Sequence, residues 1–398
     1  MAASDPMTID ERRKYLAKMV PRYRAAGTRE RGQLLTEMEA VTGLHRKSLT
    51  RLLNAASLER RPRRRQRGRR YGPEARAVVA TVWESLDYLC AERLTPALLS
   101  TARHLATFGE CHLTPEVEAQ LGTISRATVQ RMLSAMPRPT PRLPRKGPEQ
   151  ANRVRRDVPM GRIPWQTDEP GHFEVDLVHH CGASATGEYV HTIQMVDVAT
   201  GWSERVAVLG RSQAAHPQAG PRAGFRRILG RLPFPVRQLH PDNGGEFFND
   251  HLVRFWGEAI TGLRLSRSRP YHKNDNRLVE QKNDTLVRAY VGYGRLDTAA
   301  QAAALDRLYE QLWLYYNLFQ PVLHLREKTY DHGTVRRKWD TATTPYRRVR
   351  PTGVLSPEWQ ATLDARHAQT NPRQLRRTIE AGLQRLWLPP GTAALAAD

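Results

Sequence analysis

Residues 172–210 read HFEVDLVHHCGASATGEYVHTIQMVDVATGWSERVAVLG and predict three consecutive β-strands. Apolar, β-branched and aromatic residues gather in three short runs, and turn residues that include glycine separate these runs. The predicted strands span 172–180, 188–198 and 203–210. We therefore expect this stretch to begin a β-sheet.

Downstream of this stretch, strand and helix patterns alternate. We expect a fourth strand at 234–242, a helix at 249–260 and a short fifth strand at 262–271. Two further helical patterns follow, at 277–291 and 298–318. This order predicts an α/β core in which helices flank a mixed five-stranded sheet.

Three acidic residues stand out by their positions in these predicted elements. Asp176 lies in the middle of the apolar strand FEVDLV, Asp242 ends the fourth strand before Asn-Gly-Gly, and Glu280 lies early in a helix. A charge in a strand that otherwise looks buried must be paired or bind a metal ion. Carboxylate oxygens of this kind suit Mg²⁺ or Mn²⁺.

The ordered acids and the sequence around them resemble the catalytic core of integrase-like DDE transposases of bacterial insertion sequences, which are related to retroviral integrases. Between Asp242 and Glu280 lie 37 residues, which is close to the spacing typical of this family. The strings SRPYHKNDNRLVEQKN, LYYNLFQPV and RRKWDTATTPYRRV are also similar to these transposases. The resemblance covers roughly residues 165–350.

The resemblance implies a ribonuclease-H-like fold in which Asp176, Asp242 and Glu280 hold two Mg²⁺ or Mn²⁺ ions. Two such ions stabilise the attacking and leaving oxygens when a phosphodiester is cleaved and then joined. The same chemistry requires no covalent Ser, Tyr or Cys nucleophile. The three carboxylates are thus expected to be both the catalytic residues and the metal ligands.

Other polar residues near these acids have less specific interpretations. Glu174 alternates with Asp176 along the strand and is expected to have a structural role. Asp197 is expected to form a turn rather than bind metal, and Glu246 is a secondary site candidate. His179-His180-Cys181 lack the spacing of a zinc site. Residues expected to share a helix face with Glu280, or to contact phosphate near it, are Lys273, Asn276, Arg277, Asn283 and Asp284.

The N-terminal third contains two candidate helix-turn-helix motifs. In the first, within 8–56, apolar residues form two helix faces around Thr42-Gly43, and the second helix leaves polar and basic residues free for DNA. Those residues are His45, Arg46, Lys47, Thr50 and Arg51. In the second, Ser125 is the predicted N-cap, and Arg126 and Arg131 point outward. An ordinary helical hairpin is the alternative for the first motif, and two such motifs in tandem arise by chance less often than one.

Basic linkers separate the predicted domains. Residues Arg60 to Arg70 include eight arginines, and we expect Arg63, Arg64 and Arg65 to contact DNA phosphates, with a solvated linker or a localisation tag as the alternative. A Pro-rich linker follows the second helical block. The expected segments are 8–56, 57–72, 73–136, 137–164, 165–335 for the core and 340–393 for a small helical tail.

The composition favours a polyanionic partner. The chain has 398 residues, with 62 Lys and Arg against 40 Asp and Glu and a formal net charge of +22. Three scattered cysteines, and the absence of a long apolar run or an apolar leader, fit a cytoplasmic, nucleoid-associated protein. We expect double-stranded DNA as partner, both element ends and target, and a homo-oligomer on that DNA, without a membrane or a small-molecule substrate.

One segment departs from the expected pattern. Between the third and fourth strands, Pro217, Gly220, Pro221 and Gly224 interrupt the expected helix. Proline within a helix costs about 3 kcal/mol or more, so we expect an irregular loop at 213–224 and a weakly active core. A local change of reading frame, restored before residue 226, would explain the segment.

The sequence therefore predicts a DNA transposase that binds the ends of its element, cleaves them and joins them to target DNA. Two alternatives remain open. One is a transposase remnant that only binds DNA, and the other is a structure-directed nuclease of the same superfamily.

Overall fold

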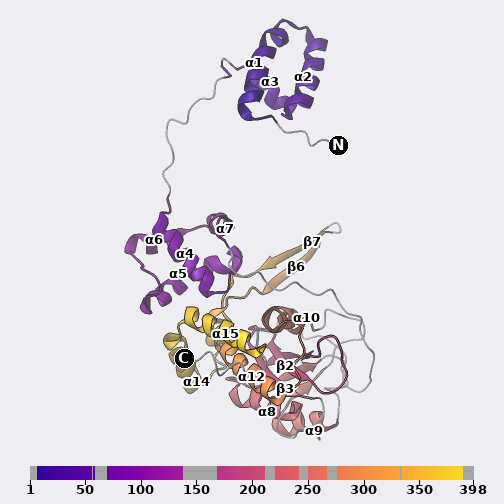
Figure 1. Cartoon of the computed structure of the whole chain (residues 1–398), viewed down its shortest axis with the longest axis vertical. Helices are drawn as coiled ribbons and strands as arrows, with labels where there is room; N and C mark the ends of the chain where they lie inside the picture. The colour runs from indigo at the N-terminus through magenta and orange to yellow at the C-terminus, as the bar shows by residue number, and fades with distance from the viewer. Residues whose placement is uncertain are drawn as a thin grey trace. The chain divides into compact units, whose positions relative to one another are not determined.

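The chain forms two compact units, residues 1–70 and 71–398 (Figure 1). Each unit has its own buried apolar core. The structure is a computed structural model. It describes residues 7–55, 57–58, 70–137, 168–210, 220–241, 250–266, 276–331 and 334–388.

The described residues of the N-terminal unit form three helices, α1 (Ile9–Ala25), α2 (Thr28–Thr42) and α3 (Arg46–Leu53). Thr8 caps α1 through a capping box with Glu11. Gly43 ends α2 with a φ of 66°, a left-handed conformation that glycine adopts without strain. The core side chains are Leu16, Leu34, Leu35, Met38, Leu49 and Leu53. Helices α2 and α3 thus lie on either side of the break predicted at Thr42-Gly43.

The larger unit contains the predicted mixed five-stranded sheet, in the order β3-β2-β1-β4-β5. Strands β1, β2 and β3 are antiparallel neighbours, whereas β4 runs parallel to β1 and β5 runs parallel to β4. The strands are β1 (His172–His179), β2 (Val190–Asp197), β3 (Ser203–Leu209), β4 (Gln238–Pro241) and β5 (Arg264–Leu265). The last two strands are shorter in the structure than the sequence pattern predicts.

Helices cover both faces of this sheet. Helix α8 (Pro221–Arg231) packs on β2 and β3 through the face that carries Val206 and Val208. Because strand residues alternate between faces, Ala207 and Leu209 point the other way, into a cluster with α12 (Ala299–Leu314). The remaining helices of the core are α9 (Asp250–Ala259), α10 (Arg277–Lys282), the π-helix η1 (Asn283–Arg288), α11 (Ala289–Val291) and the π-helix η2 (Tyr315–Phe319).

The prediction of an irregular loop at 213–224 is wrong for residues 221–224, which are helical. Pro221 is the first residue of α8 after the N-cap Gly220, a position where proline fits because its missing N–H has no helical partner. Gly224, Phe225 and Ile228 are buried and supply the apolar face that seemed absent. Residues 211–219 lie outside the described part of the chain. Because α8 includes Pro221 and Gly224, these two residues no longer indicate a change of reading frame.

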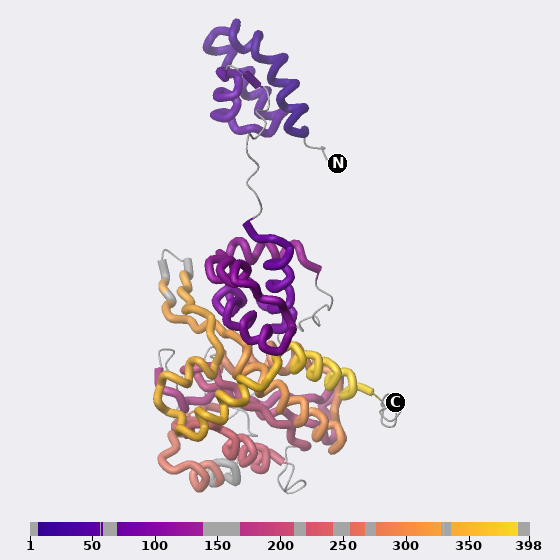
Figure 2. Tube along the Cα trace, turned by 90° about the vertical axis from the view of Figure 1, so that its left-hand side faces the viewer, coloured from indigo at the N-terminus to yellow at the C-terminus, as the bar shows by residue number. Residues whose placement is uncertain are grey.

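Helices α4–α7 belong to the same compact unit as the sheet, although we expected 73–136 to be a domain of its own. They are α4 (Pro73–Ser85), α5 (Ala91–Thr107), α6 (Pro115–Thr123) and α7 (Arg126–Ser134). Tyr315 Oη donates to Ser85 O at 2.7 Å, and Arg373 forms ion pairs with Glu84 and Glu110. Figure 2 shows this helical group beside the C-terminal helices. These contacts make the group part of the larger unit.

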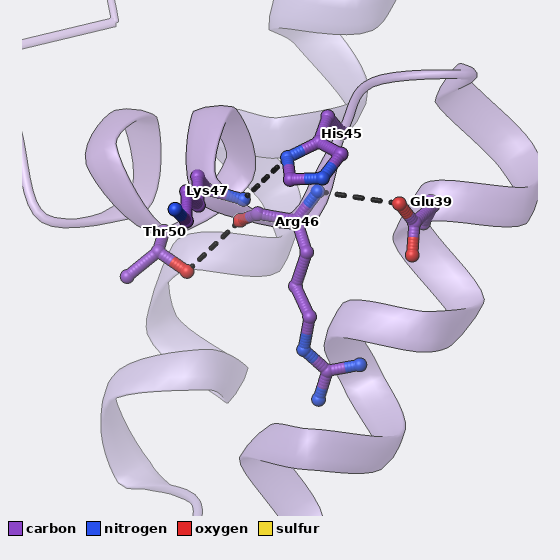
Figure 3. Close-up of a pocket in the computed structure, with 5 residues that line it drawn as sticks. All are labelled: Glu39, His45, Arg46, Lys47 and Thr50. Carbon is purple, nitrogen blue, oxygen red and sulfur yellow. Dashed lines mark hydrogen bonds between the residues drawn. The ribbon is translucent and has the colours of Figure 1, made fainter. Parts of the chain in front are cut away.

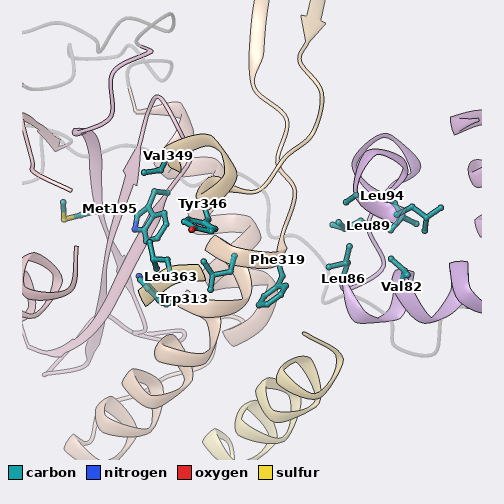
Figure 4. Packing of buried hydrophobic residues seen from close by; sticks show 14 of the residues in the cluster. Val82, Leu86, Leu89, Leu94, Met195, Trp313, Phe319, Tyr346, Val349 and Leu363 are labelled. Atoms are coloured by element: carbon teal, nitrogen blue, oxygen red, sulfur yellow. The ribbon is translucent and has the colours of Figure 1, made fainter. Parts of the chain in front are cut away.

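A single apolar cluster extends from these helices to the sheet (Figure 4). In the helical group it includes Leu86 and Leu94, in the sheet it includes Met195, and in α12 and η2 it includes Trp313 and Phe319. Burial of large apolar side chains on this scale is the main contribution to the stability of the unit.

The C-terminal third contains a two-stranded ribbon, β6 (Leu325–Asp331) and β7 (Thr334–Trp339), that the sequence pattern did not predict. After it come α13 (Pro345–Val349), a 3₁₀ turn η3 (Arg350–Thr352), α14 (Pro357–Gln369) and α15 (Pro372–Leu386). Leu375 and Ile379 of α15 pack against the side chains of α12. Among the helices of the described residues, none combines the length and the apolarity that crossing a bilayer requires.

Candidate active site

Asp176 lies in the middle of β1, half-buried, and contacts the helix that carries Glu280. Its Oδ1 accepts a hydrogen bond from the backbone N–H of Leu177 at 2.8 Å. Its Oδ2 accepts a hydrogen bond from Nδ2 of Asn283. Because Asn283 follows Glu280 by three residues, the two side chains are neighbours on one helix face. The structure thus brings the helix segment of Glu280 to Asp176.

Glu174, two residues before Asp176, fixes the start of α10. The N-cap residue Asn276 provides no side-chain hydrogen bond to this helix. Instead, Oε2 of Glu174 accepts from the backbone N–H groups of Leu278 at 2.7 Å and Val279 at 2.9 Å. These are donors that a helix leaves without an internal partner. Glu174 therefore attaches the first turn of α10 to β1.

Burial makes the carboxyl group of Glu174 a weaker acid than usual. Its side chain is fully buried, and loss of solvation raises its pKa to about 7, although the two N–H donors and the charge of Arg277 act in the opposite direction. A positive charge or a metal ion nearby would stabilise the carboxylate form. The structural role predicted for Glu174 is consistent with these contacts.

Glu280 lies in the first turn of α10 and is exposed to solvent. At Asn283 the α-helix passes into the π-helix η1. Short π-helical segments inside longer helices occur frequently at functional sites. The change in helical geometry occurs at the residue that contacts Asp176.

The third predicted acid lies outside the described residues. Pro241, the last described residue of β4, pairs in parallel register with Val175, which precedes Asp176. Asp242, Glu246 and Lys273 follow in parts of the chain that are not described. Within the described ranges, no group of three His, Cys, Asp or Glu side chains is placed to hold a metal ion.

The described donors nevertheless fit a divalent cation of the Mg²⁺ type. Asn283 Oδ1 and Glu174 Oε1 are buried and accept no hydrogen bond within the described chain. Together with the carboxylate of Asp176, they are oxygen donors, which this class of ion prefers. Asn283 bonds directly to Asp176, so its unsatisfied oxygen belongs to a residue in contact with that carboxylate, whereas Glu174 lies two residues away on the same strand.

A row of polar side chains extends from Asp176 across the sheet. Asp176 pairs with Gln194 on β2, which pairs with Arg205 on β3, so the three side chains share one face. Arg205 is 1% exposed, and burial lowers its pKa to about 10. Reasoning from the sequence did not identify Gln194 or Arg205. The signal was present, because both are polar residues inside strands with otherwise apolar patterns.

Aromatic rings and a backbone carbonyl surround the buried guanidinium. Arg205 Nη2 donates to Leu312 O at 3.2 Å, and its Cζ lies 5.9 Å from the ring centroid of Tyr309 and 5.8 Å from that of Tyr316. The ammonium of Lys282, in α10, lies 5.1 Å from the Tyr316 centroid. Cation–π contacts of this kind stabilise buried cations. Tyr316 therefore links the buried row to the helix of Glu280.

The remaining polar candidates have structural contacts. Asp197 is buried and accepts four hydrogen bonds, from the N–H groups of Gly171, His172 and Thr200 and from the hydroxyl of Thr200. This is the turn role predicted for it. His179 and His191 bring their Nδ1 atoms within 2.8 Å of each other. His180 contacts the Thr192 hydroxyl at 2.8 Å, and burial lowers its pKa to about 3.

In the N-terminal unit, α3 presents part of the basic surface expected for DNA (Figure 3). Lys47 and Arg51 are exposed, and His45 caps the helix by accepting from the Lys47 N–H at 3.3 Å. Arg46 is directed differently from the prediction. Its guanidinium returns to α2, where Nη2 donates to Gly32 O at 2.9 Å and Nη1 donates to Thr36 at 3.1 Å. Arg46 is therefore not free in the way the sequence suggested.

The other predicted DNA contacts are distributed along the chain. Ser125 caps α7 as predicted, and Arg126 and Arg131 are exposed. Arg126 lies 3.5 Å from Glu92, and Arg131 donates to Ala127 O at 3.2 Å. Arg277 is half-buried at the first position of α10. Arg63, Arg64, Arg65 and Lys273 lie outside the described residues.

Comparison with known proteins identifies a relative along most of the chain. No protein-family model matches the chain. Among solved structures, the catalytic core domain of BIV integrase in crystal form I is 13% identical, with a TM-score of 0.27 over 44% of this chain and 91% of that one, a likeness too weak to assign a fold. The uncharacterized protein y4rM of Sinorhizobium fredii (strain NBRC 101917 / NGR234) is 38% identical over 343 residues, which cover 86% of this chain and 96% of y4rM. Because this similarity spans nearly all of both proteins, the chain belongs to the same family as y4rM.

Proposed function

We propose that this protein is a DNA transposase, which binds the ends of a mobile element, cleaves them and joins them to target DNA. The observation that carries this proposal is the hydrogen bond between Asn283 and Asp176, since it joins β1 to the helix of Glu280. This bond holds together residues that are 107 apart in the sequence, and it supports the DDE resemblance because Asn283 lies three residues after Glu280. The order of the acids along the chain and the excess of positive charge support the same function.

In this proposal, Asp176, Asp242 and Glu280 are the catalytic carboxylates and hold two Mg²⁺ or Mn²⁺ ions. When bound, such ions stabilise the attacking and leaving oxygens of an in-line phosphoryl transfer. The chain positions its own ligands. Glu174 fixes the start of α10, and Asn283 orients one oxygen of Asp176 and leaves its own Oδ1 available.

The basic N-terminal regions are proposed to bind the DNA ends. Lys47 and Arg51 on α3, and Arg126 and Arg131 on α7, are exposed on short helices with buried apolar backs. A recognition helix in a major groove has this division of faces. Arg63–Arg65, Lys273 and Arg277 are proposed phosphate contacts, and we propose that a homo-oligomer assembles on the DNA.

The test is the substitution of each acid by its amide. Asp176→Asn, Asp242→Asn and Glu280→Gln each remove one negative charge with little change of shape. Each variant should lose metal-dependent cleavage and joining by at least about a hundredfold, because transition-state charge stabilisation is lost. Binding of end DNA, measured in EDTA, should remain at the wild-type level. A variant that transfers strands at a near-wild-type rate would exclude that residue from the site.

A remnant that only binds DNA is the less favoured alternative. It was suggested by the interrupted helix, and the described part of that segment, α8, packs on the sheet through buried residues. Helices α8 and α12 thus cover opposite faces of the sheet, which favours an intact core over a remnant.

A further inference from the structure

The ribbon formed by β6 and β7 is not part of the proposed active site. It pairs from Leu325 with Trp339 to Asp331 with Thr334, with an irregularity beside Arg326. No other described element packs extensively against either strand. Figure 1 shows the ribbon extending away from the five-stranded sheet. A hairpin of two strands alone is at best marginally stable in water, so its retention calls for a partner surface.

The charge of the ribbon indicates what that partner is. Residues 325–339 include five Lys or Arg against two Asp or Glu. Arg336, Arg337 and Lys338 are consecutive and exposed, and Arg326 on the other strand is exposed as well. Trp339, at the base of the ribbon, is 49% exposed. The described part of this surface is therefore basic, and it also carries the exposed ring of Trp339.

The arrangement of these cations favours a polyanion on both sides of the ribbon. Successive strand residues point to opposite faces, so Arg337 lies on the face opposite Arg336 and Lys338. Charged residues on an edge strand also prevent aggregation, but that function does not require three consecutive charges of one sign. The major groove of B-DNA is about 12 Å wide and admits a two-stranded ribbon, with phosphates on both sides.

From these observations we infer that the β6–β7 ribbon is a DNA-binding arm that inserts in a groove of duplex DNA and contacts phosphates through Arg336, Arg337 and Lys338. The inference rests on the proposed function, because it takes DNA as the partner. The contacts are to phosphate, so they add affinity without selecting a base sequence.

The test measures the affinity of the full chain for a short duplex of arbitrary sequence over a range of salt, in EDTA to prevent cleavage. The ribbon variant is Arg336→Gln, Arg337→Gln and Lys338→Gln. The control variant is Arg307→Gln, Arg377→Gln and Arg385→Gln, which removes the same charge from exposed positions on α12 and α15.

The ribbon variant should bind about tenfold more weakly at low salt. The slope of log affinity against log salt should fall by about 0.9 for each phosphate that the variant no longer neutralises, and the control should keep the wild-type slope. A charge-retaining variant, Arg336→Lys with Arg337→Lys, should also keep it, since lysine binds phosphate as a point charge. Circular dichroism checks that each variant is folded.

Three results would overturn the inference. If the ribbon variant and the control have the same slope, the ribbon does not contact DNA, while the proposed function stands. If the ribbon variant binds DNA normally but changes the mass of the oligomer, the partner is a second copy of the chain. If the wild-type chain binds no duplex at all, the inference and the proposed function fail together.

Discussion

Glu174 is the residue on which the geometry of the candidate site depends most. Its carboxylate is the side-chain cap of α10, although it comes from a strand 104 residues earlier in the sequence. The same residue is buried, and loss of solvation raises its pKa to about 7.

Replacing Glu174 by Gln should make stability less dependent on pH. The pKa of Glu174 is higher in the folded chain than the ordinary value of 4.5, so the folded state favours the protonated form. That contribution is fully present below pH 4.5 and is lost as pH rises through about 7, by up to about 3 kcal/mol. Since Gln resembles the protonated acid, Glu174→Gln should match wild type near pH 4.5 and exceed it at pH 8.

Urea unfolding of both proteins in EDTA, from pH 4.5 to 8, measures this difference. A difference in unfolding free energy that stays constant across the range would show that Glu174 does not titrate in the way its burial indicates. Glu174→Ala is the positioning control, because it removes the acceptor of two N–H groups and should lower both stability and strand transfer.

Among the elements, α8 shows why local sequence rules misjudged one segment. Its glycine and proline suggest a broken helix when read locally, yet each has a place in the structure. Pro221 begins the helix, and Gly224 lets the helix approach the sheet closely. A Cβ on Gly224 would come within 2.7 Å of Val208 Cγ1 and 2.8 Å of Ile193 Cδ1. Such close packing depends on residues of other elements, which a local pattern does not contain.

Gly224→Ala should therefore destabilise the chain, even though alanine is the better helix former by about 1 kcal/mol. The added methyl overlaps branched side chains on the sheet, and overpacking of this kind costs about 1–3 kcal/mol. Gly230, in the same helix, is the matched control, since nothing lies within 4 Å of a Cβ placed there. Thermal melting should show a lower Tm for Gly224→Ala and an equal or higher Tm for Gly230→Ala. The opposite order would mean that α8 does not pack as described.

The strands and helices of the core could be predicted because the sequence signals for them are local. Their alternation and turn residues are local signals, and the order of elements led to the mixed sheet. The contacts of Asp176 with Asn283 and of Glu174 with α10 were not predictable, because they join residues more than a hundred positions apart. The β6–β7 ribbon was missed because its alternation is mostly of polar residues, without an apolar face to mark it.

For the whole molecule, the distribution of charge matters as much as the site. The net charge of +22 is spread over two compact units and the arginine run that ends at Arg70. Phosphate contacts add affinity for any DNA, whereas base contacts select a sequence. We expect the helices to select the element ends and the basic segments to add affinity for all DNA.

Replacing Arg63, Arg64 and Arg65 by Ala should weaken binding equally on all DNA sequences. The slope of log affinity against log salt should become shallower in the variant. The change should be about 0.9 for each phosphate contact that is lost. Titrations of one specific and one unrelated duplex at several salt concentrations measure both effects. An unchanged slope would mean that the run is a solvated linker.

The most direct measurement of the central claim is strand transfer by the purified wild-type chain. Duplexes made from inverted repeats in the DNA that flanks the gene serve as donors, and a plasmid serves as target, with Mg²⁺, Mn²⁺ or EDTA. The proposal predicts cleaved ends and sequenced donor–plasmid joints with either metal, and none in EDTA or with Asp176→Asn. Binding of the donor ends without cleavage, or cleavage without joining, in the presence of metal would contradict it.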